Sequence, residues 1–512
     1  MPVEEERKYG VGTRFVLPHL TGTLPDGGTV TTHPPVTLTA TYYDTADLRL
    51  ARAGVSLRYR AGDSDRPWTV KLPTDTPGSR HEIDVSGHPD AIPAPLVDLT
   101  TVYHRGQPLA PVVTIRTSRV RHDLRDTDGT LLAEVADDGV SVLDGRRVRT
   151  RFREVEVERK AAPRKLLRRI GAALHDAGAV EGVFAAKHAR ALGEPAAQPP
   201  DLTPPTRRPS RSDSAADVIT YALAIDVIRT LSHDPLVRLR AGVGNNDTAV
   251  HQMRVGLRRL RTDLRVFGTL LDQEWVQSVD GELRWIAGML GAARDAEVQR
   301  ERLRHTAALD PAYPLDEEMI AGIDAELALW QHQALDALDD ALATPRYVAL
   351  AGTLVTAASQ PPTSGLAAGP ADTVLPGLVS REWRKFARRA DALLGTPPTP
   401  AGHPDQEWHD VRKLAKRARY ASEVTALVVG APAADLAQAL AAVGELLGTH
   451  QDACVAAQTW LQINQSAPDD RRLAVTTARL FERERDTARG AQAAYPALWR
   501  EISGERLTGW LR

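Results

Sequence analysis

Charged residues at every second position of successive strand-like segments constrain the fold of the first half more than any other feature. In VEEERKYG, at positions 3 to 10, Glu4, Glu6 and Lys8 would point the same way from an extended strand. The segments LRYR, WTVKL, RHEIDV and FREVEVER repeat this arrangement, with Leu, Val, Ile and Tyr on the other face. One such strand usually marks a solvated edge, but many in one small sheet predict a closed barrel with a charged lumen.

The predicted lumen must compensate its own charges, because buried like charges are costly without partners. Arginine and lysine bind phosphate oxygens, whereas clustered carboxylates bind hard divalent cations such as Mg²⁺ or Mn²⁺. A strand face that carries both therefore predicts a site for a metal ion and a polyphosphate. Such chemistry relies on positioning and charge neutralisation and requires no serine or cysteine nucleophile.

The strand motifs, with YYDTADLRL at 42 to 50, resemble the CYTH domain of the triphosphate tunnel metalloenzymes over residues 1–193. This resemblance implies an eight-stranded antiparallel β tunnel that binds a triphosphate and a divalent metal. It implies phosphate contacts from Lys8, Arg58, Arg60, Lys71, Arg80, Arg119, Arg121 and Lys187. It implies metal ligands Glu4, Glu6, Glu134, Asp137, Glu154 and Glu156, with Glu4, Glu6 and Lys8 as the catalytic residues.

The resemblance leaves the substrate open among inorganic triphosphate, thiamine triphosphate, RNA 5′-triphosphate ends and ATP cyclised by an adenylate cyclase. The candidate aromatic platforms for a base or thiazolium ring, Tyr42, Tyr43, Tyr59 and Trp68, fit packing roles better. The sequence therefore favours inorganic triphosphate.

A Pro-rich segment at 194–212 predicts a linker, because its prolines and small polar residues cannot build a core. Beyond it, residues 213–512 show helical periodicity with almost no strand signal. The motifs HQMRVGLRRLR at 251 to 261 and HDVRKLAKRAR at 409 to 419 share one spacing of basic residues. LGAARDAEV and LGTHQDACV follow them at nearly equal separations, which predicts two repeat units at about 213–370 and 371–512.

Each of these two motifs forms one basic ridge on its helix, since offsets of 0, 3, 7 and 10 residues share a face. Asp295 and Asp452 could orient the ridge arginines or cap helices. The segments resemble the CHAD domain, an all-α helical bundle, which implies binding of inorganic polyphosphate. The implied contacts are His251, Arg254, Arg258, Arg259, Arg261, His409, Arg412, Lys413, Lys416, Arg417 and Arg419.

Net charge, cysteine count and the distribution of apolar residues narrow the possible partners and location of the protein. A formal net charge of −2 over 512 residues predicts no polyanion partner by itself, so any basic surface must be local. One cysteine, Cys454, excludes an intrachain disulfide and, among apolar neighbours, is expected to be a small buried filler. The start lacks a signal peptide and no stretch suits a membrane span, which predicts a cytoplasmic protein, with polyphosphate granules as a site of association.

Together these patterns predict a multidomain α+β protein, a metal-dependent triphosphatase tunnel followed by a helical polyphosphate-binding module. The alternative is a polyphosphate-binding or scaffold protein without turnover. Nucleic acid is the competing polyanion, but the ridges lack interleaved aromatic residues for base stacking.

Overall fold

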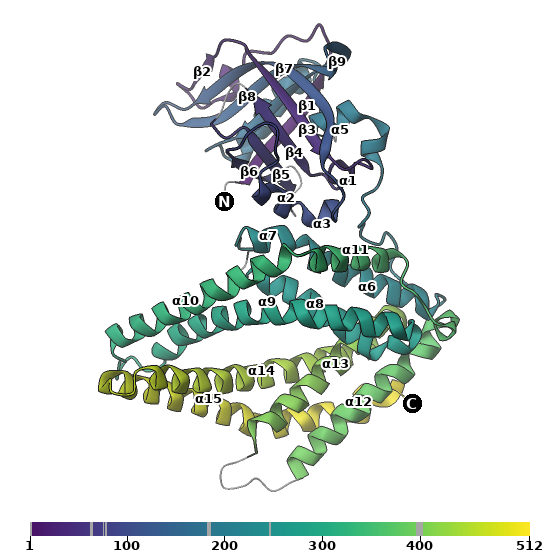
Figure 1. The fold of residues 1–512 in the computed structure, drawn as a ribbon, viewed down its shortest axis with the longest axis vertical. Coiled ribbons are helices and arrows are strands. Elements are labelled where there is room, and N and C mark those ends of the chain that lie inside the picture. The colour runs from purple at the N-terminus through teal and green to yellow at the C-terminus, as the bar shows by residue number, and fades with distance from the viewer. Residues whose placement is uncertain are drawn as a thin grey trace. The chain divides into compact units, whose positions relative to one another are not determined.

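The computed structural model describes residues 3–61, 65–74, 76, 79–181, 186–244, 247–395 and 403–511, without the side chains of Val3 and Glu4. The chain forms two compact units, Met1–Thr203 and Pro204–Arg512, the first rich in strands and the second helical (Figure 1). Within the described ranges, no helix combines the length and apolar character that a membrane crossing demands.

The first unit is built on an antiparallel barrel. Around it the strands follow the order β1-β6-β5-β4-β3-β7-β8-β9, and pairing of β9 with β1 closes the ring of eight. Two short strands lie outside this ring: β2 pairs with β7, and β10 pairs with β1. The predicted eight-stranded tunnel is thereby confirmed. The strands are β1 Val3–Val11, β2 Thr29–Thr32, β3 Val36–Asp44, β4 Ser56–Ala61, β5 Trp68–Pro73, β6 Ser79–Val85, β7 Ala110–Arg125, β8 Leu131–Asp144, β9 Arg147–Arg159 and β10 Val180–Glu181.

An amphipathic helix, α4 Arg164–Asp176, supplies the apolar cover that the barrel wall needs on its outside. Its buried face, including Leu167 and Ile170, packs with Tyr9, Val135 and Val157 of the strands. Successive side chains of a strand therefore point alternately to this apolar outer layer and to the lumen, as the period-two pattern requires. The remaining short helices of the unit are η1 Thr21–Thr23, α1 Arg49–Arg52, α2 Ala94–Leu99, α3 Thr101–His104, α5 Lys187–Leu192 and η2 Glu194–Ala197.

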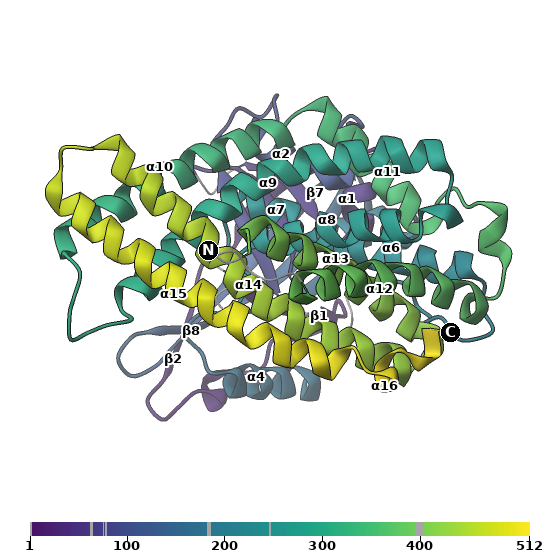
Figure 2. The same cartoon turned by 90° about the horizontal axis from the view of Figure 1, so that it is seen from below.

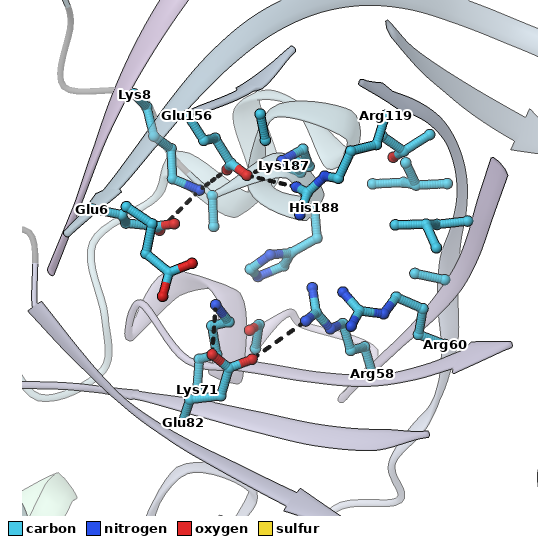
Figure 3. A pocket seen from close by; sticks show the side chains of 18 of the residues that line it. Glu6, Lys8, Arg58, Arg60, Lys71, Glu82, Arg119, Glu156, Lys187 and His188 are labelled. Carbon is cyan, nitrogen blue, oxygen red and sulfur yellow. Dashed lines mark hydrogen bonds and ion pairs between the residues drawn. The ribbon is translucent and has the colours of Figure 1, made fainter. Parts of the chain in front are cut away.

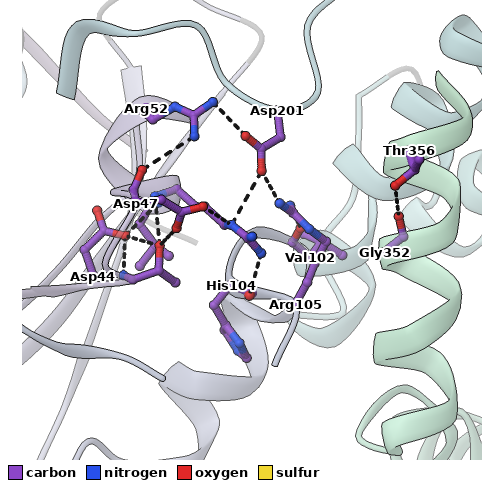
Figure 4. Close-up of polar contacts among 12 residues, drawn as sticks. Asp44, Asp47, Arg52, Val102, His104, Arg105, Asp201, Gly352 and Thr356 are labelled. Atoms are coloured by element: carbon purple, nitrogen blue, oxygen red, sulfur yellow. Dashed lines mark hydrogen bonds and ion pairs between the residues drawn. The ribbon is translucent and has the colours of Figure 1, made fainter. Parts of the chain in front are cut away.

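Acidic side chains fasten the loops at one end of the barrel (Figure 4). Asp44, at the end of β3, accepts hydrogen bonds from the backbone N–H groups of Leu50 (2.9 Å) and Ala51 (2.8 Å) at the start of α1. Asp201 pairs with Arg52 at 2.6 Å and with Arg105 just after α3. The early part of the predicted 194–212 linker thus contacts the barrel unit through charged side chains.

The second unit is wholly helical, apart from isolated bridges, over the residues that the structure describes. Six of its helices begin at an N-cap whose side chain accepts a backbone hydrogen bond, namely Ser214, Thr248, Asp272, Asp316, Thr344 and Asp470. The helices are α6 Ala215–Ser232, α7 Asp234–Arg238, α8 Ala249–Val266, η3 Gly268–Leu270, α9 Gln273–Ala307, α10 Glu317–Leu342, α11 Pro345–Ser359, η4 Gly365–Ala368, α12 Ala371–Gly395, α13 Asp405–Val429, α14 Ala431–Ser466, α15 Arg471–Ile502, α16 Glu505–Thr508 and η5 Gly509–Leu511.

Long helices of this unit pack as neighbours, α9 beside α10 and α14 beside α15, while α13 lies between α12 and α14 (Figures 1 and 2). One core joins Trp383 and Phe386 of α12 to Trp408 of α13 and Tyr495 of α15. A second core surrounds Trp460 of α14. The multidomain α+β fold class predicted from the sequence is therefore confirmed.

Candidate functional site

Three adjacent strands carry a row of carboxylates into the barrel. The register places Glu6 of β1 opposite Glu158 of β9, and Glu158 opposite Glu134 of β8. All three line a cavity of about 690 Å³. Because neighbouring strands lie about 4.8 Å apart, each member of this acidic row is close enough to share a cation with the next.

The wall made by β4, β5 and β6 is predominantly basic, and Figure 3 shows Arg58 and Arg60 across the lumen from Glu6. Glu82 links two of its cations, with Oε1 3.5 Å from Arg58 and Oε2 3.2 Å from Lys71. Arg80 donates a hydrogen bond to the carbonyl of Gly54 at 3.1 Å. Of the described residues that line the cavity, nine are Lys or Arg and six are Asp or Glu. This excess of positive charge favours an anionic ligand.

Helix α5 enters the lumen with Lys187 and His188 (Figure 3). The imidazole of His188 stacks on Tyr42 with ring centroids 4.9 Å apart and an interplanar angle of 13°. Burial, reinforced by the nearby charge of Lys8, lowers the pKa of His188 to about 3. His188 is therefore neutral at physiological pH and lines the site as a stacked ring rather than as a cation.

A deeper group of three acids, Asp138, Glu154 and Glu156, has carboxylate oxygens within 4.8 Å of one another. We call these residues the deep trio. The ammonium of Lys187 lies among them, 2.7 Å from Asp138, 3.1 Å from Glu154 and 2.7 Å from Glu156. Arg119 adds contacts of 2.7 Å to Asp138 and 2.9 Å to Glu156. The chain's own cations thus already compensate the deep trio, which leaves little charge there for a metal.

The buried ion pairs shift the pKa values of their members. Burial alone would lower the pKa of Lys8, but Glu156 at 2.7 Å and Glu6 at 3.1 Å raise it. Burial would raise the pKa of Glu156, but the adjacent Lys187, Lys8 and Arg119 hold it well below its usual range. Lys8 and Glu156 are therefore charged near neutral pH.

In the acidic row, unlike the deep trio, the pKa of a carboxylate is raised. Burial, with a contribution from the neighbouring Glu158, raises the pKa of Glu134 despite the attraction of Arg121. A carboxylate in such surroundings gains from an added cation. Because Mg²⁺ and Mn²⁺ take one or two carboxylates plus water and phosphate oxygens, the acidic row fits such an ion better than the deep trio does.

In the helical unit, α8 and α13 bring their basic residues together around Tyr420. The Nε of Arg258 donates a hydrogen bond to the Tyr420 hydroxyl at 3.1 Å. The guanidinium of Arg259 lies over the Tyr420 ring, 4.7 Å from its centroid, and that of Arg419 lies 5.7 Å away. Two segments more than 140 residues apart in the sequence therefore contribute to one basic cluster.

Four cations, Arg254, Arg258, Arg412 and Lys416, repel one another within this cluster. Burial and the charges of Arg412 and Arg258 lower the pKa of Lys416 to about 7. Burial likewise lowers the pKa of Arg412, and its Nε is buried without a hydrogen-bond partner among the described residues. Such a cluster is stabilised by an anion that supplies the missing acceptors.

Comparison with known proteins assigns each unit to a domain family. The CYTH domain family matches residues 4–191 and the CHAD domain family matches residues 222–461. The chain is a CYTH–CHAD fusion protein. CYTH domains belong to the triphosphate tunnel metalloenzyme superfamily.

A curated relative matches almost the whole chain. "Uncharacterized protein Rv2226" of Mycobacterium tuberculosis (strain H37Rv) is 32% identical over 528 residues, which cover 98% of this chain and 96% of the relative. Among solved structures, "PptA from Streptomyces chartreusis" is 23% identical and covers 56% of this chain and 100% of its own, with a TM-score of 0.46. A CHAD domain from the plant Ricinus communis is 22% identical and covers 60% of this chain and 95% of its own, with a TM-score of 0.42.

In the CYTH unit, most residues singled out from the sequence meet in the lumen. Glu4 pairs with Arg80 in the backbone register, but its side chain lies outside the described residues. Glu154 is 1% exposed and lies in the deep trio. The cavity is lined by Glu6, Lys8, Arg58, Arg60, Lys71, Arg80, Arg119, Arg121, Glu134, Glu156 and Lys187.

The structure corrects the predicted position of Asp137 in the lumen. It lies outside the lumen and forms an ion pair of 2.6 Å with Arg153. Its neighbour Asp138 points inward instead, because Glu134, Ala136 and Asp138 share one face of β8. The lumen residues Asp138, Lys160 and His188 were missed, and the two-residue period from Glu134 would have found Asp138.

In the CHAD unit, the predicted residues are less uniform. Lys413 is exposed and pairs with Asp410 at 2.8 Å, whereas Arg261 pairs with Asp280 at 3.0 Å. His409 contacts Gln451 at 2.6 Å, and burial lowers its pKa, as it does for His251. Burial therefore favours the neutral form of both histidines.

The LGxxxD aspartates lie inside long helices, Asp295 in α9 and Asp452 in α14, so the capping interpretation is wrong. Asp295 instead accepts a hydrogen bond from Arg254 at 3.0 Å. The acidic residue therefore orients a ridge arginine, which is the other role considered from the sequence.

Proposed function

We propose that the CYTH unit hydrolyses inorganic triphosphate with Mg²⁺ or Mn²⁺, and that the CHAD unit binds inorganic polyphosphate. The observation that supports this proposal most directly is the lumen itself, where an acidic row faces a basic wall inside one closed barrel. A ligand that bridges the two must present many anionic oxygens and a bound cation, as a metal triphosphate does.

The basic wall accounts for binding in this proposal. Arg58, Lys71 and Arg80 would exchange their contacts with Glu82 and the Gly54 carbonyl for phosphate oxygens. Lys8, held by Glu6 and Glu156, would meet the phosphate nearest the acidic row. A divalent ion held by one or two carboxylates of the acidic row (Glu6, Glu134 and Glu158) would supply charge neutralisation and lower the pKa of a bound water. The chain's own part is to orient the phosphates without a covalent step.

The aromatic residues near the lumen favour a substrate without a base. Trp68 is fully buried and lies 5.0 Å from the Tyr43 ring and 5.3 Å from the Tyr59 ring. Tyr42 is already stacked with His188. These rings pack against one another, so they supply no free platform for adenine or a thiazolium ring, which supports inorganic triphosphate.

Phosphate release tests the enzymatic half of the proposal. With Mg²⁺ and inorganic triphosphate, the double variant E6Q/E158Q should lose at least about a hundredfold in kcat/KM, because two carboxylates of the acidic row become neutral. The matched control is E5Q, since Glu5 belongs to the same strand but pairs with Arg159 instead, at 2.7 Å. Equal release by the wild type and E6Q/E158Q would refute the acidic row as the catalytic site. No release by the wild type would leave only the binding protein without turnover.

Salt-dependent binding tests the CHAD half. The variant R258A/R412A/K416A should weaken polyphosphate binding and reduce the slope of log K against log salt by about 2, since three charges release fewer counterions. The control R489A removes an exposed arginine outside the basic cluster that already pairs with Asp486. An unchanged affinity and slope in the triple variant would refute the basic cluster as the binding site.

A further inference from the structure

A second cluster of metal-ligating side chains lies in the CHAD unit and includes none of the ridge residues that the proposed function uses. Asp405 is the first residue of α13, and its carboxylate meets His450 and Cys454 of α14. His450 and Cys454 are four residues apart, so they share one face of that helix. The ligand atoms of the three residues all lie within 4.8 Å of one another.

The distances suit a tetrahedral ion. His450 Nε2 lies 3.7 Å from Cys454 Sγ and 3.7 Å from Asp405 Oδ1. A tetrahedral Zn²⁺ with ordinary bond lengths places nitrogen and sulfur ligands about 3.6 Å apart, and nitrogen and oxygen ligands about 3.3 Å apart. Small side-chain movements would therefore complete the coordination.

The surroundings position the oxygen and nitrogen ligands. Arg485 binds Oδ2 of Asp405 at 2.8 Å, which leaves Oδ1 buried without a hydrogen-bond partner among the described residues. His450 is 1% exposed, and its ring is fixed beside Trp408 at 5.7 Å. Unlike a buried filler, Cys454 is partly exposed.

We propose that Asp405, His450 and Cys454 form a Zn²⁺ site. One carboxylate, one thiolate and one neutral imidazole balance the charge of a divalent ion, and this mixed ligand set is typical of zinc. Gln492 completes the site. Its amide nitrogen lies 2.9 Å from His450 Nε2, the atom that would bind the ion. Metal binding replaces this hydrogen bond, and the amide oxygen of Gln492 or a water takes the fourth position.

Cobalt provides the decisive probe. Cys454 is the chain's single cysteine, so a thiolate-to-cobalt charge-transfer band can come only from this site. The metal-free full-length protein, titrated with Co²⁺, should develop that band to a limit of one equivalent, and Zn²⁺ should abolish it. Co²⁺ bound in the CYTH lumen has oxygen ligands and gives no such band, so failure here is distinguishable from failure of the proposed triphosphatase.

Variants assign the ligands. C454S should lose the band, and H450A and D405N should each raise the dissociation constant for Co²⁺ by about tenfold or more. E445Q, an exposed position on the same helix, should leave the titration unchanged. A second readout needs no variant, because Zn²⁺ should protect wild-type Cys454 from alkylation. Absence of the band together with unprotected alkylation at saturating metal would overturn the site.

Discussion

At the scale of single residues, Lys416 shows how like charges tune a binding group. Its ammonium faces Arg412, Arg258 and Arg254, and Asp452 opposes them. The resulting pKa of about 7 lies far below the ordinary value for lysine. The charge of the CHAD cluster therefore changes within the physiological pH range.

This shift predicts a pH dependence. As pH rises through about 7, Lys416 loses its proton and the cluster loses one positive charge. Polyphosphate affinity should fall on the order of tenfold between pH 6 and pH 8, whereas K416R, which stays protonated, should show a flatter profile. Binding isotherms of both proteins at fixed salt check this. Parallel profiles would show that other groups cause the dependence.

Glu156 carries a second prediction at this scale. It contacts Lys8, Lys187 and Arg119 at 2.7 to 2.9 Å, and it is buried. E156Q should destabilise the CYTH unit by about 3–5 kcal/mol, because it leaves buried cations without their shared partner. Denaturant unfolding measures this effect. In E5Q, which removes a partly exposed pair with Arg159, the loss should stay near 1 kcal/mol or below.

The same scale shows what residue patterns could predict. Alternation predicted the inward direction of Glu6, Lys8 and Glu156 correctly, because side-chain direction in a strand follows position alone. Asp137 was misplaced by one residue, which moves a side chain to the opposite face. His188 has no periodic signal, since it reaches the lumen from a short helix.

At the scale of elements, the packing of α4 on β1 depends on one glycine. A Cβ atom added at Gly171 would lie 2.5 Å from the hydroxyl of Tyr9. G171A should therefore destabilise the CYTH unit by about 1–3 kcal/mol through overpacking. The double variant Y9F/G171A should recover most of this loss, because it lacks the oxygen that clashes.

A double-mutant cycle measured by denaturant unfolding isolates this contact. An interaction energy near zero between the two changes would place the strain elsewhere in α4.

Sequence patterns did not predict how the elements are arranged relative to one another. Strand segments were visible, but the register that aligns Glu6 with Glu158 joins residues 152 positions apart. The contact of Asp405 with His450 and Cys454 likewise depends on how α13 packs on α14. Periodicity reports which face is buried, not which neighbour covers it.

At the scale of the whole molecule, each unit has its own core, and the ion pairs of Asp201 assign the segment before Thr203 to the CYTH unit. A fragment of residues 1–203 should therefore unfold at a higher temperature than a fragment of residues 1–193, which lacks the partner of Arg52 and Arg105. We expect a difference of a few degrees, equivalent to about 1 kcal/mol.

Calorimetry of the two fragments, with D201N in the longer one as a control, checks this prediction. Equal melting temperatures for all three would show that Asp201 contributes nothing to the stability of the barrel.

The closure of the barrel by β1 and β9 has a consequence for synthesis on the ribosome. Residues 5–11 complete their hydrogen bonding only with residues 153–159, so the opening segment must wait until the last strand of the ring has emerged. During that interval its amide and carbonyl groups stay available to other chains, which makes nascent CYTH units a natural client for chaperones.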